Sequence, residues 1–192
     1  KREFTPRVHE AMTLLFNEMD SLRWELEVCH QNEVHILDLV DHHSFLPVLT
    51  RRAFYRDLGR AERHVATTTD PSTLLVLGVK NLESIRTSHG LGVHDALLTG
   101  IAERLVLEEQ EVGPIGYLGA ATFGIIHNVA DQAETARVAE GLAAQLTNHS
   151  IRWKDQNFGA AVGWGTAVVK AGQSPGEIHL AADADLRSRL RR

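Results

Sequence analysis

The first forty residues of the chain carry a regular repeat of apolar positions. Thr5-Pro6 marks a helix start, with threonine as N-cap and proline in the first turn, and neither proline nor glycine recurs before Pro47. The apolar residues follow alternating steps of four and three, a period of about 3.5 residues that is typical of a coiled coil. We therefore expect a long dimerising helix over residues 5–41, with a seam formed by Val8, Met12, Leu15, Met19, Leu22, Leu26 and Cys29 and, after a break at Glu33, by Ile36 and Val40.

Further apolar residues make the hydrophobic stripe of this helix wider than a strict two-position seam. A wider stripe also fits a helix that packs on its own domain, a four-helix contact or a docking face for a partner protein. We favour the dimerising coiled coil because the seam is regular over most of the helix. The additional apolar residues are Leu14, Phe16, Trp24, Val28, Val34, Leu37 and Leu39.

After Val40 the apolar pattern changes to shorter segments that predict alternating helices and strands. A continuous apolar run at 74–79 is typical of a buried strand, and runs at 114–118 and 122–127 around Gly119-Ala120-Ala121 indicate a β-hairpin. Such alternation is typical of a layered α/β domain. We expect an N-terminal helix in residues 1–42 and one α/β domain in residues 43–192, with helices at 49–64, 81–88, 92–109, 131–148 and from 174 onward, and a last strand at 158–169.

The composition narrows the classes of function. With 192 residues, of which 43% are hydrophobic and 23% charged, the chain is large enough for a core that folds without metal or disulfide support. The net charge of −5 and the pI near 6.1 argue against a protein that binds nucleic acid. No stretch reaches the roughly 20 apolar residues of a membrane span, and no secretion signal opens the chain.

Cysteine and histidine usage bears on compartment and metal binding. The single Cys29 excludes an internal disulfide and fits a reducing compartment, so we expect a cytoplasmic protein without direct membrane insertion. The 11 histidines lack the spacing of known zinc motifs, which favours a solvated or pH-tuned set. We therefore expect neither a metal nor another cofactor. The chain opens on Lys1 and not on methionine, so a longer parent protein is compatible with the sequence.

Five short motifs occur along the α/β domain. They are Arg51-Arg52-Ala53-Phe54, the segment HGLGVHDALL at 89–98, Gly119-Ala120-Ala121-Thr122-Phe123, the segment AVGWG at 161–165 and the segment AADADL at 181–186. In this order and spacing they resemble the motifs of the GGDEF domain, the diguanylate cyclase domain, over residues 43–190. A coiled-coil helix directly before the domain is also usual in that family. The resemblance implies a nucleotidyl-cyclase-like sheet flanked by helices.

The resemblance also provides a test of catalytic competence. Active members of the family join two GTP molecules, each held by one half of a dimer, into cyclic di-GMP, and they use carboxylates to hold divalent metal. The position of one metal-binding aspartate is Gly78 here, and the acidic positions of the hairpin are Ala121 and Thr122. The first hairpin glycine is kept as Gly119, but the second, which lets the backbone approach the nucleotide, is Ala120. The sequence therefore predicts a domain without cyclase activity.

The remaining nucleotide-contacting positions of the family are also changed. Glu83 stands at a lysine position and would repel phosphate, Arg86 stands at an asparagine position, and Asp95 retains the aspartate that reads guanine. The phosphate-binding lysine near the C-terminus is Leu190. The RxxD motif through which the family binds its own product is replaced by Gln110-Glu111-Val112-Gly113. The usual role of inactive members as cyclic di-GMP receptors thus lacks its residues as well.

These observations favour a non-enzymatic regulatory module. The long helix would make a homodimer, and the eroded domain would offer a surface to another signalling or localisation protein. An alternative hypothesis is a guanine-nucleotide sensor that keeps weak binding through Asp95 and the loop around Gly90. A third, less favoured, is a different nucleotidyl chemistry that uses Asp95 and nearby histidines.

Overall fold

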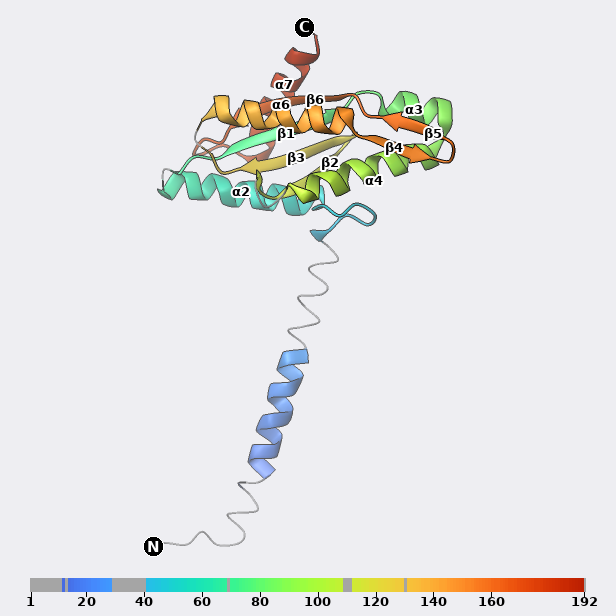
Figure 1. Cartoon of the computed structure of the whole chain (residues 1–192). Helices are drawn as coiled ribbons and strands as arrows, with labels where there is room; N and C mark the ends of the chain where they lie inside the picture. The colour runs from blue at the N-terminus through green and yellow to red at the C-terminus, as the bar shows by residue number, and fades with distance from the viewer. Residues whose placement is uncertain are drawn as a thin grey trace, which may run out of the picture. The chain divides into compact units, whose positions relative to one another are not determined.

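The chain forms two compact units, Lys1–Val40 and Asp41–Arg192, and each is described by itself. The computed structural model describes residues 12, 14–28, 41–68, 70–108, 112–129 and 131–191 (Figure 1). Within these residues, no helix is both long enough and apolar enough to cross a membrane.

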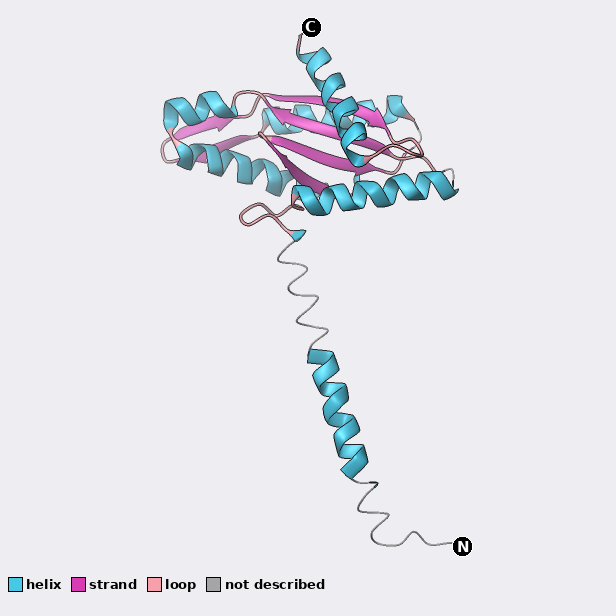
Figure 2. Cartoon of the chain, turned by 180° about the vertical axis from the view of Figure 1, so that it is seen from behind, coloured by secondary structure: helices cyan, strands magenta, loops and turns pink. Residues whose placement is uncertain are grey.

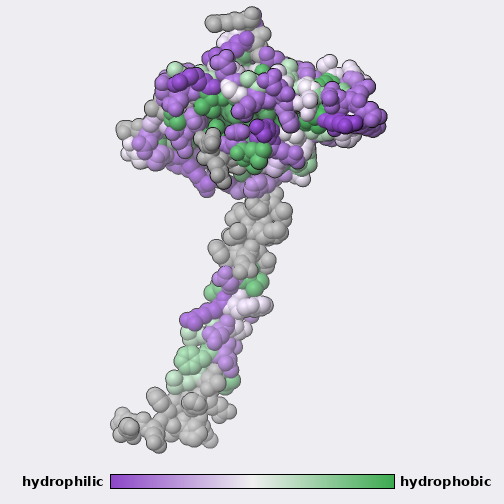
Figure 3. Space-filling model, in the orientation of Figure 1, coloured by the Kyte–Doolittle hydropathy of each residue, from purple (hydrophilic) through white to green (hydrophobic). Residues whose placement is uncertain are grey.

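In the first unit, residues 14–28 are helical, which confirms a helix at this place in the sequence. Its large apolar side chains lie at the surface, where Leu15 is 64% and Leu22 51% exposed (Figure 3). The predicted pairing of this helix with a second copy stays a prediction. Of the predicted seam, Met12, Leu15, Met19, Leu22 and Leu26 lie within the described residues, and Val8, Cys29, Ile36 and Val40 lie outside them.

The second unit is built on a four-stranded antiparallel sheet with the strand order β2-β3-β1-β6. The central strand β1 (Thr73–Val79) pairs with β3 (Thr122–His127) on one side and with β6 (Val162–Val168) on the other. Strand β2 (Ile115–Gly119) pairs with β3. A separate two-stranded hairpin consists of β4 (Ser150–Trp153) and β5 (Gln156–Gly159).

Helices cover both faces of the sheet and make three layers (Figures 1 and 2). Because side chains alternate along a strand, Leu75 and Leu77 of β1 enter one core, and Leu74 and Val76 enter the other. The first core is closed by α4 and α6, and the second by α2 and α7. The helices are α2 (Arg51–Thr68), α3 (Leu82–His89), α4 (Leu91–Leu107), α6 (Gln132–Asn148) and α7 (Pro175–Leu190).

The prediction of one strand over residues 158–169 was wrong. Strand β5 ends at Gly159 and β6 begins at Val162, and the β4–β5 hairpin was not predicted at all. At the break, the Asn81 side chain donates to the Gly159 carbonyl oxygen (2.9 Å) and accepts from the Ala161 amide (2.8 Å). These two bonds take backbone groups that a continuous strand would have used for its ladder, so the strand is interrupted there.

The segment 41–50 leads into the domain and is bound tightly to it. Leu49 exchanges hydrogen bonds with the edge of β2, from its amide to the Ile115 carbonyl (3.0 Å) and from the Tyr117 amide to its own carbonyl (2.9 Å). Arg56 of α2 forms a bidentate ion pair with Asp41 at 2.9 and 2.7 Å. This guanidinium lowers the pKa of the Asp41 carboxyl below its usual value.

The packing of α7 on β6 yields a first prediction. A Cβ on Gly165 would overlap the backbone of α7 at Leu186 and at Ala182, and backbone cannot move aside as a flexible side chain can. We expect Gly165→Ala to lower the free energy of unfolding by about 3 kcal/mol, measured by urea denaturation.

The matched control is Gly141→Ala on α6, where a Cβ would meet no atom within 4 Å. The same substitution there should raise the free energy of unfolding by about 1 kcal/mol, because alanine is the better helix former. Equal effects at the two positions would contradict the close approach of α7 to the sheet.

Candidate functional site

The predicted hairpin around Gly119-Ala120-Ala121 is present as the connection between β2 and β3. Gly119 and Thr122 face each other as strand partners, so Ala120 and Ala121 form a two-residue turn. Both alanines have positive φ, 49° and 57°. This is the geometry of a type I′ turn, which favours glycine or asparagine over alanine. The turn thus keeps its backbone shape without the residues that adopt it most easily.

The sheet brings the predicted metal positions together. Gly78, near the end of β1, pairs with Thr122 on one side and with Gly163 on the other. The adjacent Val79 amide donates a hydrogen bond to the Ala121 carbonyl oxygen at 3.0 Å. Gly78, Ala121 and Thr122 therefore lie at one end of the sheet, and their side chains supply one hydroxyl and no carboxylate.

The space next to Gly78 is also occupied. A Cβ on Gly78 would come within 3.1 Å of the Leu186 Cδ2 atom, which packs there from α7. Leu186 is buried in the second core, so a longer side chain at position 78 would have to displace it. Position 78, where the family resemblance expects an aspartate, thus lies against the apolar side chain of Leu186.

The other predicted nucleotide contacts lie on α3 and α4. Arg86 forms a bidentate ion pair with Glu83 one turn earlier, at 2.9 and 2.5 Å. This pair lowers the pKa of Glu83 chiefly through the hydrogen bonds from Arg86, and nearby His94 acts in the same direction. Asp95 shares a hydrogen bond of 2.8 Å with the His94 imidazole. Glu83 and Arg86, which are exposed, and His94 and Asp95, which are half-buried, thus form one polar cluster at the turn between the two helices.

The structure does not join this cluster to the hairpin. Among the described residues, no hydrogen bond or ion pair connects Asp95 or Arg86 with Ala120, Ala121 or Thr122. Leu190 is the last residue of α7. Of the positions that replace the RxxD motif, Gln110 and Glu111 lie outside the described residues, and Val112 is buried in the first core.

A second polar group near the hairpin was not predicted from the sequence. Arg51 and Tyr55 of α2 and His179 of α7 are linked by hydrogen bonds, from the guanidinium to the phenol oxygen (3.1 Å) and between the phenol and the imidazole Nδ1 (2.6 Å). Arg51 and His179, together with Asp183, line a pocket of about 280 Å³ beside Gly119. Burial lowers the pKa of His179, Arg51 lowers it further, and Asp183 opposes both. The spacing of Arg51 and Tyr55 on one helix face was visible in the sequence, but their contact with His179 spans 124 positions.

The sheet order, the layering and the hairpin define a domain of the nucleotidyl-cyclase-like α/β class. Residues 41–191 match the family model described as diguanylate cyclase, GGDEF domain. The chain therefore belongs to the GGDEF domain family.

Solved structures show the same fold. The coiled coil and GGDEF domain of DgcB from Caulobacter crescentus, crystallised with c-di-GMP, is 18% identical, with a TM-score of 0.81 over 92% of this chain and 94% of that one. The diguanylate cyclase SiaD from Pseudomonas aeruginosa, in complex with its activator SiaC, is 16% identical, with a TM-score of 0.80 over 96% of this chain and 71% of that one. The GGDEF domain of PA1120 from Pseudomonas aeruginosa is 23% identical, with a TM-score of 0.71 over 78% of this chain. No curated protein sequence is similar enough to this chain to count as a match.

The divalent metal that this family implies does not fit the residues present at the site. In the described part of the chain, no group of three or more histidine, cysteine, aspartate or glutamate side chains is placed to hold a metal ion. The hairpin end of β1 offers backbone carbonyls and the Thr122 hydroxyl, whereas hard divalent cations are held in proteins chiefly by carboxylates. Gly78, Ala121 and Thr122 therefore do not supply the carboxylates on which such a metal site depends.

The strained turn gives a second prediction. An alanine in the left-handed region costs roughly 1–2 kcal/mol relative to the right-handed region, whereas glycine adopts both. We expect Ala120→Gly to raise the free energy of unfolding by about 1 kcal/mol. The measurement is urea denaturation monitored by circular dichroism.

The control is the same substitution at Ala144, an exposed residue inside α6. Ala144→Gly should lower the free energy of unfolding by about 1 kcal/mol. A loss of stability at both positions would mean that Ala120 does not hold a left-handed backbone.

Proposed function

We propose that this chain is a GGDEF domain without cyclase activity that acts as a dimeric regulatory module and binds another protein. The observation that carries the proposal is the pairing of Gly78 with Thr122 beside Ala121, at the place where active members hold metal with carboxylates. A transition state that carries several negative charges needs those cations for electrostatic support. Without them, binding and positioning alone do not make a cyclase.

Two further contacts support the absence of catalysis. A Cβ on Gly78 would come within 3.1 Å of the Leu186 Cδ2 atom, so a carboxylate side chain at this position would require Leu186 to move. Arg86, the one cation among the predicted nucleotide contacts, is engaged by Glu83 through two hydrogen bonds. A phosphate group would have to compete with this carboxylate for the guanidinium. The cores on both faces of the sheet are nevertheless complete, as expected if the domain is needed for its shape.

The exposed apolar face of the N-terminal helix supports the dimer. Leu15, Leu22 and Leu26 are more than half exposed in the single chain, at the spacing of a coiled-coil seam. A helix with such a face gains stability when the face is covered by a second copy. The similar structure of DgcB also contains a coiled coil together with its GGDEF domain.

Binding of another protein is supported by the similar SiaD structure, in which a protein of this fold is in complex with its activator SiaC. The single Cys29 supports a cytoplasmic location for the proposed module, because a chain that cannot form an internal disulfide suits a reducing compartment.

A guanine-nucleotide sensor is the alternative function. It is favoured by Asp95, which retains the guanine-reading residue and lies beside the turn at Gly90. It is opposed by the Glu83–Arg86 ion pair and by the Ala120 methyl group in the turn. Nucleotide binding without turnover distinguishes this alternative from the favoured proposal.

The third prediction concerns both functions. Incubated with GTP and Mg²⁺ or Mn²⁺, the full chain should form no cyclic di-GMP detectable by mass spectrometry. GTP at about 1 mM should leave the melting temperature unchanged, whereas a sensor with a Kd of about 10 µM would gain about 2.7 kcal/mol of stability. For a chain of this size such a gain raises the melting temperature by roughly 5 °C or more.

The control for this experiment is Asp95→Ala. A GTP-induced rise in melting temperature that this variant abolishes would replace the proposal by the sensor function. Formation of cyclic di-GMP by the unmodified chain would overturn the proposal itself.

The fourth prediction concerns the dimer. The full chain should have the mass of a dimer in light scattering after size exclusion, and the double variant Leu15→Glu/Leu22→Glu should have the mass of a monomer, because buried carboxylates at a coiled-coil seam are strongly unfavourable. The matched control, Asn17→Glu/Ser21→Glu, adds the same charge at two positions outside the seam and should stay dimeric. A monomeric unmodified chain would refute the predicted pairing.

A further inference from the structure

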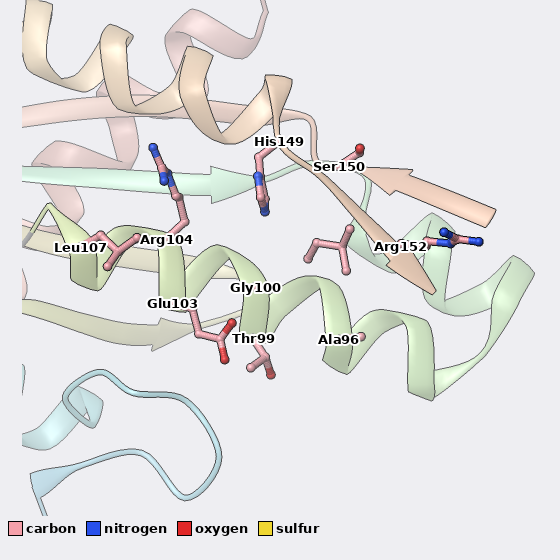
Figure 4. Close-up of a pocket in the computed structure, with 10 residues that line it drawn as sticks. Ala96, Thr99, Gly100, Glu103, Arg104, Leu107, His149, Ser150 and Arg152 are labelled. Atoms are coloured by element: carbon pink, nitrogen blue, oxygen red, sulfur yellow. The ribbon is translucent and has the colours of Figure 1, made fainter. Parts of the chain in front are cut away.

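The largest groove of the domain is lined by charges of both signs. It has a volume of about 730 Å³ and lies between α4 and residues 149–152 (Figure 4). A Cβ on Gly100 would overlap the side chain of Ile151, so this isoleucine packs directly on α4. Both Arg104 and Glu103 line the groove, and this mixture favours no single class of ligand. A more specific feature lies where the chain enters the domain.

The entry segment, residues 41–50, is a loop that closes on itself and is anchored in the domain. The Thr50 amide donates a hydrogen bond to the Asp41 carbonyl oxygen (2.6 Å), and the His43 amide donates one to the Val48 carbonyl oxygen (2.9 Å). Val48 is buried in the first core. Together with the strand bonds to β2 described above, these contacts hold the segment in one conformation.

The His43 imidazole packs between two aromatic rings. Phe45 of the same segment and Tyr117 of β2 lie edge to face with it, at centroid distances of 4.8 and 5.2 Å. The Tyr117 phenol oxygen in turn accepts a hydrogen bond of 3.3 Å from the Ala121 amide, in the turn of the β2–β3 hairpin. His43 is thus linked to this turn through a single tyrosine.

The Nδ1 atom of His43 is buried and has no hydrogen-bond partner among the described residues. A neutral imidazole can carry its proton on Nε2, so that Nδ1 is a bare nitrogen. An imidazolium carries a proton on both nitrogens, and its Nδ1–H would be a buried charged donor without an acceptor. Such a donor is costlier than an unpaired acceptor of a neutral ring. The packing therefore favours the neutral imidazole.

No charged side chain among the described residues offsets this cost. Burial lowers the pKa of His43, and no charged group contributes to the shift. The charged groups of the segment and of α2 act on Asp41 instead, since Arg56 pairs with it and His42 and Arg52 also lower its pKa. From β2, the imidazole meets the phenol described above.

We propose that His43 is a pH-sensitive contact, which holds the entry segment on β2 while its imidazole is neutral and loosens both the segment and the packing on Tyr117 when it is protonated. This goes beyond the proposed function, because it concerns regulation of the fold by pH. The sign follows from linkage: a histidine whose pKa is lowered by folding contributes stability that is complete above its ordinary pKa of 6.5 and is lost as the pH falls through the lower folded-state pKa. Through the bond from Tyr117 to Ala121, the loosening would reach the hairpin turn.

The test is amide hydrogen exchange of the full chain, measured by NMR at pH 7.5 and pH 5.0. The reporters are the amides of His43, Leu49 and Tyr117, which bond within the segment or between it and β2. The reference is the set of β1 amides, because global unfolding exposes reporters and reference alike. We expect the protection of the reporters relative to β1 to fall at least about threefold at pH 5.0, since a pKa difference of one unit corresponds to about a tenfold change in equilibrium.

Two matched variants assign the effect. His43→Phe keeps an aromatic ring beside Phe45 and Tyr117 but cannot titrate, so the relative protection should no longer depend on pH. His42→Phe makes the same change at the neighbouring exposed histidine and should leave the pH dependence intact. Asp41 does not interfere, because its lowered pKa keeps its ion pair with Arg56 charged at pH 5.0.

Titration of the His43 imidazole by NMR in the unmodified chain gives a second result that needs no variant. A pKa at or above 6.5, which attraction of an imidazolium by the aromatic rings would produce, would overturn the proposal. Relative protection that is independent of pH would overturn it as well, as would a pH dependence that His42→Phe abolishes and His43→Phe retains. None of these results bears on cyclic di-GMP synthesis or on the dimer, so the proposed function stands or falls separately.

Discussion

The central strand β1 is the constraint on which the rest of the domain depends. It is hydrogen-bonded along both edges, to β3 and to β6, and its side chains enter a core on each face. Leu74, Leu75, Val76 and Leu77 are all at most 1% exposed. Burial of both faces requires a helix layer on each side, so the positions of α2, α4, α6 and α7 follow from this one strand. The hairpin end of the domain is fixed in the same way, because Gly78 and Val79 belong to β1.

The backbone and the side chains of the hairpin region depend on different constraints in this chain. The β2–β3 turn keeps its two-residue, positive-φ geometry, although alanines now adopt it, and the strand register that places position 78 beside position 122 is intact. What differs from the family motif is the set of side chains that this backbone carries. A backbone arrangement is maintained by hydrogen bonds that any residue can make, whereas metal binding depends on particular oxygen atoms. The backbone of the hairpin can therefore be present without the carboxylates that a metal site requires.

Sequence patterns predicted the parts of the structure that depend on local information. The apolar run of β1, the hairpin around Ala120 and the helix of residues 14–28 were confirmed, because periodicity and turn residues report directly on such elements. The β4–β5 hairpin was missed because Ser150–Trp153 is short and mostly exposed, so its apolar alternation is weak. The break before β6 was missed because it depends on the Asn81 side chain, which is remote in sequence.

In the candidate site, too, the sequence predicted what depends on local information or on the family resemblance, and not the contacts between remote segments. The family resemblance brought Gly78, Ala121 and Thr122 together, and the sheet register does the same. The ion pair between Glu83 and Arg86 was within reach of the sequence, since the two residues are one helical turn apart. Contacts between remote segments were not, and these include the link from Tyr55 to His179 and the packing of Ile151 against Gly100. Contacts of this kind depend on how the helices and strands pack against one another, and a local sequence pattern carries no information about that packing.

The attachment of Leu49 to β2 has a consequence for how the molecule behaves in a crowded solution. Strand β2 lies at the end of the four-stranded sheet, and an outer strand with unpaired amides and carbonyls is a template for another chain. Leu49 already occupies two of those groups, those of Ile115 and Tyr117. The entry segment therefore shields one border of the sheet from intermolecular strand addition, and an intruding strand would have to displace it first.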